Sequence, residues 1–189
     1  MLMTEIKYRR HILVTGGTRS GKSKFAEDLA GRIGEEIIYL ATAQALDDEM
    51  KERIKRHQQR RPKNWRTIEE PLEASGIISG CQRGATVLLD CLTLFLSNWF
   101  FKDEVLSLEY REEIINQKIA SLAKTVKGSE ANIIIVSNEL GWGLVPENEL
   151  SRRFRDLAGD ANQRIAEVCE EVYLLISGIP VQIKGGRNV

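Results

Sequence analysis

The sequence has few cysteines and no excess of charge, and each shortage excludes a class of protein. The three cysteines, Cys81, Cys91 and Cys169, are an odd number without Cys-x-x-Cys spacing, so they indicate neither a disulfide framework nor a zinc site. Basic and acidic residues both number 27, which gives no global attraction to nucleic acid or to an anionic membrane. We therefore expect no nucleic-acid partner, and any recognition of anions must be local.

Long apolar runs are also missing. The most apolar segment, residues 92–101, is interrupted by Thr93, Ser97 and Asn98 and is far shorter than the roughly 20 residues that span a bilayer. The first ten residues precede an apolar run of strand length rather than the apolar core of a signal peptide. Because the cysteine usage also suits a reducing compartment, we expect no membrane insertion and a cytoplasmic location.

A complete phosphate-binding motif is present near the start of the chain. Residues 16–23 read Gly-Gly-Thr-Arg-Ser-Gly-Lys-Ser, between an apolar run and a helix-prone segment. In such a loop backbone amides surround phosphate oxygens, the lysine contacts the β and γ phosphates, and the hydroxyl binds Mg²⁺. The last two roles fall to Lys22 and Ser23. The rest of the predicted nucleotide-binding loop is Gly16, Gly17, Thr18, Arg19, Ser20 and Gly21.

Strand-length apolar runs alternate with helix-like segments along the chain. Since the runs are continuously apolar, they favour parallel strands buried on both faces. The predicted strands are residues 11–14, 36–41, 86–91, 132–137 and 172–176, and the clearest helices are 47–59, 107–126 and 149–170.

These elements predict one P-loop NTPase-like α/β domain over residues 1–189, in which a mostly parallel central sheet has helices on both faces. Residues 65–69 and 181–183 are candidate edge strands, one of which could run antiparallel. Residues 1–10 form an N-terminal extension to which we assign no role.

Acidic and polar residues follow two further strands. A phosphate loop works with an acid at the end of a neighbouring strand, which holds Mg²⁺ opposite the serine hydroxyl. Asp90 is the candidate, although an aspartate there could instead cap the next helix. Asn138 and Glu139, with the glycine-rich loop after them, should face the same crevice, because ligands bind at the carboxyl ends of parallel strands. The glycines of that loop either let the backbone approach a ligand closely or simply allow the chain to turn.

His57 is a candidate nucleophile. It shares one stripe of the predicted helix with Met50 and Ile54, which is equally typical of a packed core histidine. Arg53 and Arg61 lie one turn to either side of it. Cations there would attract a polyphosphate and disfavour protonation of the imidazole, which leaves a ring nitrogen free to attack phosphorus.

Several segments together resemble the bifunctional adenosylcobinamide kinase/adenosylcobinamide-phosphate guanylyltransferase family of cobalamin biosynthesis. The resemblance extends from Ile12 to Ile183. It rests on the phosphate loop, Ala41-Thr42-Ala43, the run from Asp47 to His57, Arg61-Pro62, Trp65-Arg66-Thr67, Asn138-Glu139-Leu140-Gly141, Val145-Pro146-Glu147-Asn148, Arg153-Phe154-Arg155-Asp156, Gly159 and Asn162-Gln163.

The resemblance implies two reactions. ATP or GTP first phosphorylates the aminopropanol hydroxyl of adenosylcobinamide. A histidine, here His57, then attacks the α-phosphate of GTP, pyrophosphate leaves, and GMP passes to adenosylcobinamide phosphate to give adenosylcobinamide-GDP. Besides the phosphate loop, the implied nucleotide contacts are Ala41, Thr42, Ala43, Gln58, Gln59, Arg60, Arg61, Glu69 and Asp90. With Mg²⁺ as cofactor, Ser23 and Asp90 are its candidate ligands.

The resemblance further implies a homo-oligomer such as a trimer, for which the apolar cluster Trp99-Phe100-Phe101 is either an interface or part of the core. Two other functions stay open. A monofunctional P-loop kinase of a small molecule would use Lys22, Ser23 and Asp90 and leave His57 idle. A nucleotide-dependent switch or binding module is disfavoured, since the sequence lacks an Asn-Lys-x-Asp guanine motif.

Overall fold

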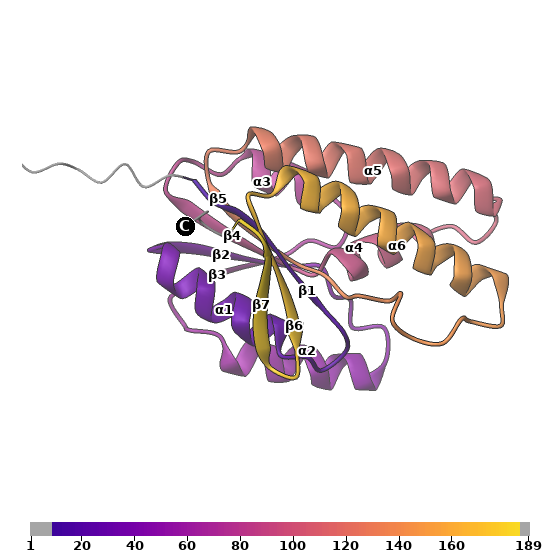
Figure 1. Cartoon of the computed structure of the whole chain (residues 1–189), viewed down its shortest axis with the longest axis horizontal. Helices are drawn as coiled ribbons and strands as arrows, with labels where there is room; N and C mark the ends of the chain where they lie inside the picture. Colours follow the sequence, from indigo (N-terminus) through magenta and orange to yellow (C-terminus); the bar gives the residue numbers. More distant parts are fainter. Residues whose placement is uncertain (1–8, 186–189) are drawn as a thin grey trace, which may run out of the picture.

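The computed structural model describes residues 9–185, and in that part of the chain all strands join one twisted sheet (Figure 1). Its order is β3-β2-β4-β5-β1-β6-β7. Strands β1 to β6 run parallel, and β7 pairs antiparallel with β6 at the edge, so the predicted fold class is confirmed. The strands are β1 (His11–Gly16), β2 (Glu36–Ala41), β3 (Arg66–Glu69), β4 (Ala85–Asp90), β5 (Asn132–Val136), β6 (Glu171–Ile176) and β7 (Ile179–Lys184).

Helices cover both faces of this sheet (Figure 1). On one side lie α1 (Lys22–Ile33) and α2 (Asp48–Arg60); on the other lie α3 (Ala74–Ser79), α4 (Leu92–Phe100), α5 (Leu108–Gly128) and α6 (Glu149–Val168). The sequence did not predict α3 and α4. The first is short, and α4 is apolar on nearly all sides because it is buried, so neither has the periodicity of a surface helix.

Each buried strand supplies side chains to two cores. Ile12 and Val14 of β1 pack with Ala26 and Ala30 of α1, whereas Leu13 between them points into the core beneath α4, α5 and α6. Both faces are therefore shielded from water, which accounts for apolar runs without polar alternation. Phe100 is fully buried, Trp99 is partly buried against the core, and Phe101 is 41% exposed, so the aromatic cluster is only partly core.

The strand register brings the predicted site residues to one edge of the sheet. Glu69 of β3 lies opposite Ala41 of β2, and Ala41 lies opposite Asp90 of β4. Asp90 in turn lies opposite Val136 of β5, which pairs with Val14 just before the phosphate loop. Strand β5 thus separates β4 from β1, so the acid expected at a neighbouring strand sits two strands away.

The predicted extension at residues 1–10 lies outside the described residues, apart from Arg9 and Arg10. Among the helices of residues 9–185, none has the length and apolar character that crossing a membrane requires.

Candidate active site

The phosphate loop makes a tight turn between β1 and α1 that depends on two glycines. Gly16 has φ +155°, and a Cβ there would lie 2.6 Å from the Leu175 carbonyl oxygen and 2.7 Å from Ser20 Oγ. Gly21 has φ +92° at the N-cap of α1, where side chains rarely fit. The loop can therefore approach both β6 and a ligand more closely than a chain with side chains at these positions.

The amino end of α1 faces this turn. No side chain caps the helix there, so its first backbone amides are available to an anion. Lys22 is 7% exposed, and its Nζ donates to the Gly17 carbonyl oxygen at 3.1 Å. Burial lowers the pKa of Lys22, an effect that nearby Cys91 and Asp90 oppose. The ammonium group is held over the loop, where phosphate oxygens would bind.

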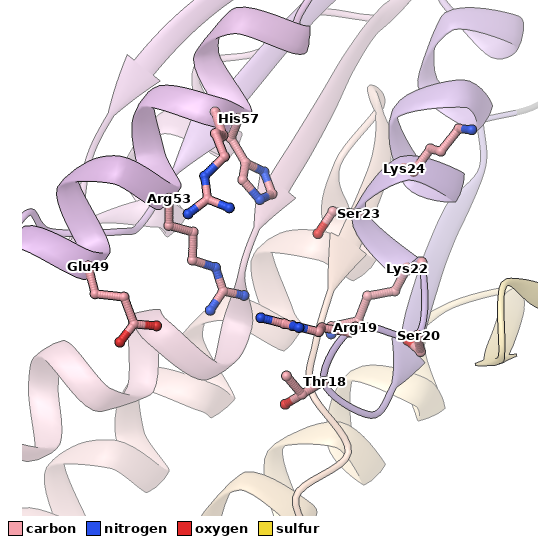
Figure 2. Close-up of a pocket in the computed structure, with 11 residues that line it drawn as sticks. Thr18, Arg19, Ser20, Lys22, Ser23, Lys24, Glu49, Arg53 and His57 are labelled. Carbon is pink, nitrogen blue, oxygen red and sulfur yellow. The ribbon is translucent and has the colours of Figure 1, made fainter.

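Two adjoining cavities open from the loop. The first, which we term the phosphate cavity, has a volume of about 440 Å³ (Figure 2). One wall is the phosphate loop, and the other is α2 with Glu49, Arg53 and His57, which face it across the gap. Five lysine or arginine side chains and a single carboxylate line it, so it favours a polyanion.

The second, which we term the strand-end cavity, has a volume of about 580 Å³ and lies at the carboxyl ends of the strands. Its walls are less charged and include apolar side chains such as Met50, Ile54 and Leu94. It is lined by predicted contacts Ala41, Ala43, Gln58, Arg61, Glu69 and Asp90, and it shares Lys22, Ser23, Arg53 and His57 with the phosphate cavity.

Asp90 lies at the centre of this arrangement. Its Oδ2 accepts a hydrogen bond from the Tyr39 hydroxyl at 2.5 Å and is 3.8 Å from Nδ1 of His57. Burial and the Asp90 charge both raise the pKa of Tyr39, which keeps its hydroxyl protonated as a donor. Arg61 stacks over the Tyr39 ring at 3.5 Å. The alternative role for Asp90 is not observed, since Cys91 is the N-cap of α4 and no side chain caps that helix.

Thr42 and Cys91 tie β2 to β4 behind the site. The buried Thr42 hydroxyl accepts from the Cys91 amide and donates to the Cys91 carbonyl oxygen, both at 2.8 Å. Burial, followed by the Asp90 charge, raises the pKa of the Cys91 thiol to about 12. Cys91 is therefore protonated at neutral pH, which makes it a poor nucleophile.

The segment after β5 meets the expectation only in part. Asn138 lines the strand-end cavity. The Glu139 carboxylate instead lies 3.4 Å from Nδ2 of Asn162 and 3.5 Å from the Thr15 hydroxyl, away from the cavities. In the loop that follows, Trp142 is 60% exposed.

The structure thus brings most predicted site residues together. Thr18 to Ser23 and His57 line the phosphate cavity, while Gly16 and Gly17 shape its loop. Thr42 and Gln59 line neither cavity, and the Arg60 side chain is outside the described part of the chain.

The sequence did not predict Tyr39 as a site residue, because it lies within the apolar run of strand β2. Arg53 was noted without being assigned to the site, although the four-residue spacing to His57 was the available signal.

The donor atoms present fit Mg²⁺. Ser23 and Asp90, which both carry side-chain oxygens, line one cavity, and Mg²⁺ is commonly bound by one or two protein ligands together with substrate phosphates. Among residues 9–185 no cluster of three or more histidine, cysteine or acidic side chains could hold a metal without such a substrate.

The sequence is similar to a known family of proteins. The model of the family described as cobinamide kinase / cobinamide phosphate guanyltransferase matches residues 12–183. The bifunctional adenosylcobalamin biosynthesis protein CobU of Escherichia coli is 43% identical over 180 residues, which cover 92% of this chain and 99% of the relative. Its counterpart CobP of Pseudomonas aeruginosa is 45% identical over 174 residues, 92% and 96% of the two chains.

A solved structure from Pyrococcus horikoshii OT3 superposes with a TM-score of 0.52 at 10% identity, covering 96% of this chain and 90% of that one, and supports the fold alone. Since the family model covers nearly the whole chain and both curated relatives exceed 40% identity, this chain belongs to the cobinamide kinase / cobinamide phosphate guanyltransferase family.

Proposed function

We propose that both reactions of the family take place in this one site and that His57 is the residue that accepts GMP. The observation that carries the proposal is that His57 lines both cavities together with Lys22 and Ser23. A single triphosphate bound to the loop would thus reach the imidazole with its α-phosphate while its outer phosphates stay at the lysine.

For the kinase reaction the loop holds ATP or GTP, and the γ-phosphoryl group passes to the hydroxyl of adenosylcobinamide. Lys22, Arg19 and the amides of α1 bind the phosphates, so that catalysis consists of positioning and charge stabilisation. The Ser23 hydroxyl and the Asp90 carboxylate would hold Mg²⁺, which would supply positive charge to the bound phosphates.

For guanylyl transfer Nδ1 of His57 faces Asp90, which leaves Nε2 for attack on the α-phosphorus of GTP. The new bond joins Nε2 to phosphorus. The bond from the α-phosphorus to the α–β bridging oxygen breaks, and its electron pair leaves with pyrophosphate. Asp90 stabilises the positive charge that the imidazole acquires. A phosphate oxygen of adenosylcobinamide phosphate then attacks the phosphorus of the bound GMP. The bond between phosphorus and Nε2 breaks, and its electron pair returns to His57.

The nucleoside lies, in this proposal, in the strand-end cavity. Ala41 and Ala43 leave room for it, and Gln58 and Glu69, whose side chains are joined by a 3.2 Å hydrogen bond, present polar groups to it. Thr42 contributes through the backbone position that its buried hydroxyl maintains. We also include Gln59 and Arg60 among the nucleotide contacts, solely because the family resemblance implies them.

We also propose a cytoplasmic homo-oligomer such as a trimer built from a single domain. The exposed edge strand β7 supports association, since Ile179, Val181 and Ile183 project from it and are each more than 40% exposed. Light scattering combined with size-exclusion chromatography tests this, and a monomeric mass at micromolar concentration would contradict it.

The covalent step is tested by incubating the protein with GTP labelled at the α-phosphate. We expect protein-bound label that is stable to alkali and lost in acid, as for a phosphorus–nitrogen bond, and located in the peptide that contains His57. The other histidine, His11, is buried in β1 and serves as the internal control.

The His57→Ala variant should take up no label. Labelling that persists in this variant, or label found on His11, would refute the assignment. A protein that phosphorylates adenosylcobinamide yet never becomes labelled would favour the monofunctional kinase instead.

A further inference from the structure

Four residues line both cavities, and one of them has no part in the reaction steps proposed above. Lys22, Ser23 and His57 hold phosphates, Mg²⁺ and GMP in the proposed reactions. The fourth is Arg53 of α2. In the proposed binding mode the outer phosphates occupy one cavity and the nucleoside the other. A side chain that borders both cavities therefore lies near the α-phosphate, which connects them.

Arg53 occupies the helix position one turn before His57. Residues four apart in an α-helix are neighbours on one face, so the guanidinium and the imidazole reach the same part of a ligand. Figure 2 shows the Arg53 guanidinium extended across the phosphate cavity toward Arg19 of the loop. Its direction is toward the place where the triphosphate would bind.

The Arg53 side chain is exposed. Within the described part of the chain it forms no hydrogen bond and no ion pair, although other cations of the same helix do. Lys51 binds Asp48 at 2.8 Å, and Arg56 lies 3.7 Å from Glu52. Arg19, Lys22 and Arg53 line one cavity that has a single carboxylate, so these cations repel one another, and a bound polyphosphate offsets that repulsion.

We propose that Arg53 is a catalytic residue of guanylyl transfer, an inference that rests on the function proposed above. Its guanidinium donates to oxygens of the α- and β-phosphates, on either side of the bond that breaks. As Nε2 of His57 bonds to the α-phosphorus, the electron pair of the broken bond moves to the bridging oxygen, and Arg53 stabilises the charge that accumulates there. A planar guanidinium donates through several nitrogens in a fixed geometry, whereas an ammonium group acts as a point charge.

The same geometry gives Arg53 a smaller part in the kinase reaction. There the bond that breaks lies between the β- and γ-phosphates, beside Lys22, rather than next to the imidazole. Loss of Arg53 should therefore slow guanylylation of His57 far more than phosphorylation of adenosylcobinamide.

The experiment measures the single-turnover rate of His57 labelling at saturating GTP. We expect Arg53→Ala to reduce this rate about 100-fold, as for the loss of one donor to a developing oxyanion, while the kinase rate at saturating nucleotide falls less than tenfold. Arg53→Lys should recover only part of the rate. The matched control is Lys55→Ala, which removes the same charge from α2 but lies outside both cavities and should retain the wild-type rate.

Three results would overturn the inference. Arg53→Ala could weaken GTP binding yet label at the wild-type rate once saturated, which would make Arg53 an attractor of phosphate only. Arg53→Ala could also lower the kinase rate and the guanylyl-transfer rate by the same factor. Finally, Lys55→Ala could slow the labelling of His57 as much as Arg53→Ala does. Thermal unfolding of each variant separates these outcomes from misfolding. If the wild-type protein itself is never labelled, the proposed function fails, whereas normal labelling of Arg53→Ala refutes the role of Arg53 alone.

Discussion

The start of the phosphate loop, at Gly16, lies too close to strand β6 to accommodate a side chain. We predict that Gly16→Ala lowers the free energy of unfolding by about 1–3 kcal/mol, because its Cβ would lie 2.6 Å from a backbone oxygen of β6 that cannot move aside. Gly17→Ala is the matched control, since a Cβ there meets no atom within 4 Å. Urea unfolding without nucleotide measures both, and equal stabilities would contradict the close approach.

The Tyr39 hydroxyl provides a second prediction at this scale. Tyr39→Phe keeps the ring beneath Arg61 but removes the hydrogen bond that orients Asp90. We expect guanylylation of His57 to slow about tenfold, as is typical when the partner of a functional group is lost. The labelling rate at saturating GTP measures the effect. A wild-type rate would mean that Asp90 is held well enough without Tyr39.

Among the helices, α2 depends on its cap more than the others, because most of its residues are exposed and only one stripe faces the protein. Asp47 accepts a hydrogen bond from the Met50 amide at 2.7 Å. We predict that Asp47→Ala destabilises α2 by about 1 kcal/mol and accelerates amide hydrogen exchange within residues 48–60.

Ser107 offers a comparison for that experiment, since it caps the more buried α5 in the same way. Ser107→Ala should leave exchange in α2 unchanged. If Asp47→Ala accelerates exchange throughout the sheet, α2 does not open on its own.

Strand β1 carries a pH-dependent element at its amino end. Burial lowers the pKa of His11, which is 1% exposed, and the Glu170 carboxylate only partly opposes this. In the unfolded chain the imidazole titrates near its ordinary value of about 6.5. Below that pH the unfolded state binds a proton that the folded state resists, so stability should fall as pH decreases from 7 to 5.

The contribution of His11 appears as a difference between two proteins, since carboxylates titrate in both. His11→Gln should lose less free energy of unfolding than the wild-type protein over pH 7 to 5. An identical loss in both would show that His11 takes up no additional proton on unfolding.

At the scale of the whole molecule, the sequence predicted the elements that have a regular pattern. Buried strands such as residues 36–41 agree with the structure because both their faces pack against helices. Helix α4 was missed because burial on nearly all sides removes its periodicity. Sequence order also could not reveal that β5 lies between β1 and β4, since strand order follows from the packing of the crossover helices.

The site residues likewise fall into those that the sequence predicts and those that only the fold brings together. The phosphate loop is local in sequence and could be predicted from spacing alone. His57 was a candidate from its helix position, and the family resemblance implied its role as the residue that accepts GMP. The grouping of Tyr39, Asp90 and His57 depends on contacts between residues 33 and 51 positions apart, for which the sequence carries no local signal. The sequence places Arg53 one turn from His57, but only the fold shows that it borders both cavities.

The central claim is that one phosphate loop serves two reactions of which His57 performs one. It is tested most directly by measuring both products, adenosylcobinamide phosphate and adenosylcobinamide-GDP, in Lys22→Ala and His57→Ala side by side. We expect Lys22→Ala to lose both activities, while His57→Ala accumulates adenosylcobinamide phosphate and forms no adenosylcobinamide-GDP. Wild-type guanylyl transfer from adenosylcobinamide phosphate by Lys22→Ala, or by His57→Ala, would contradict a shared site.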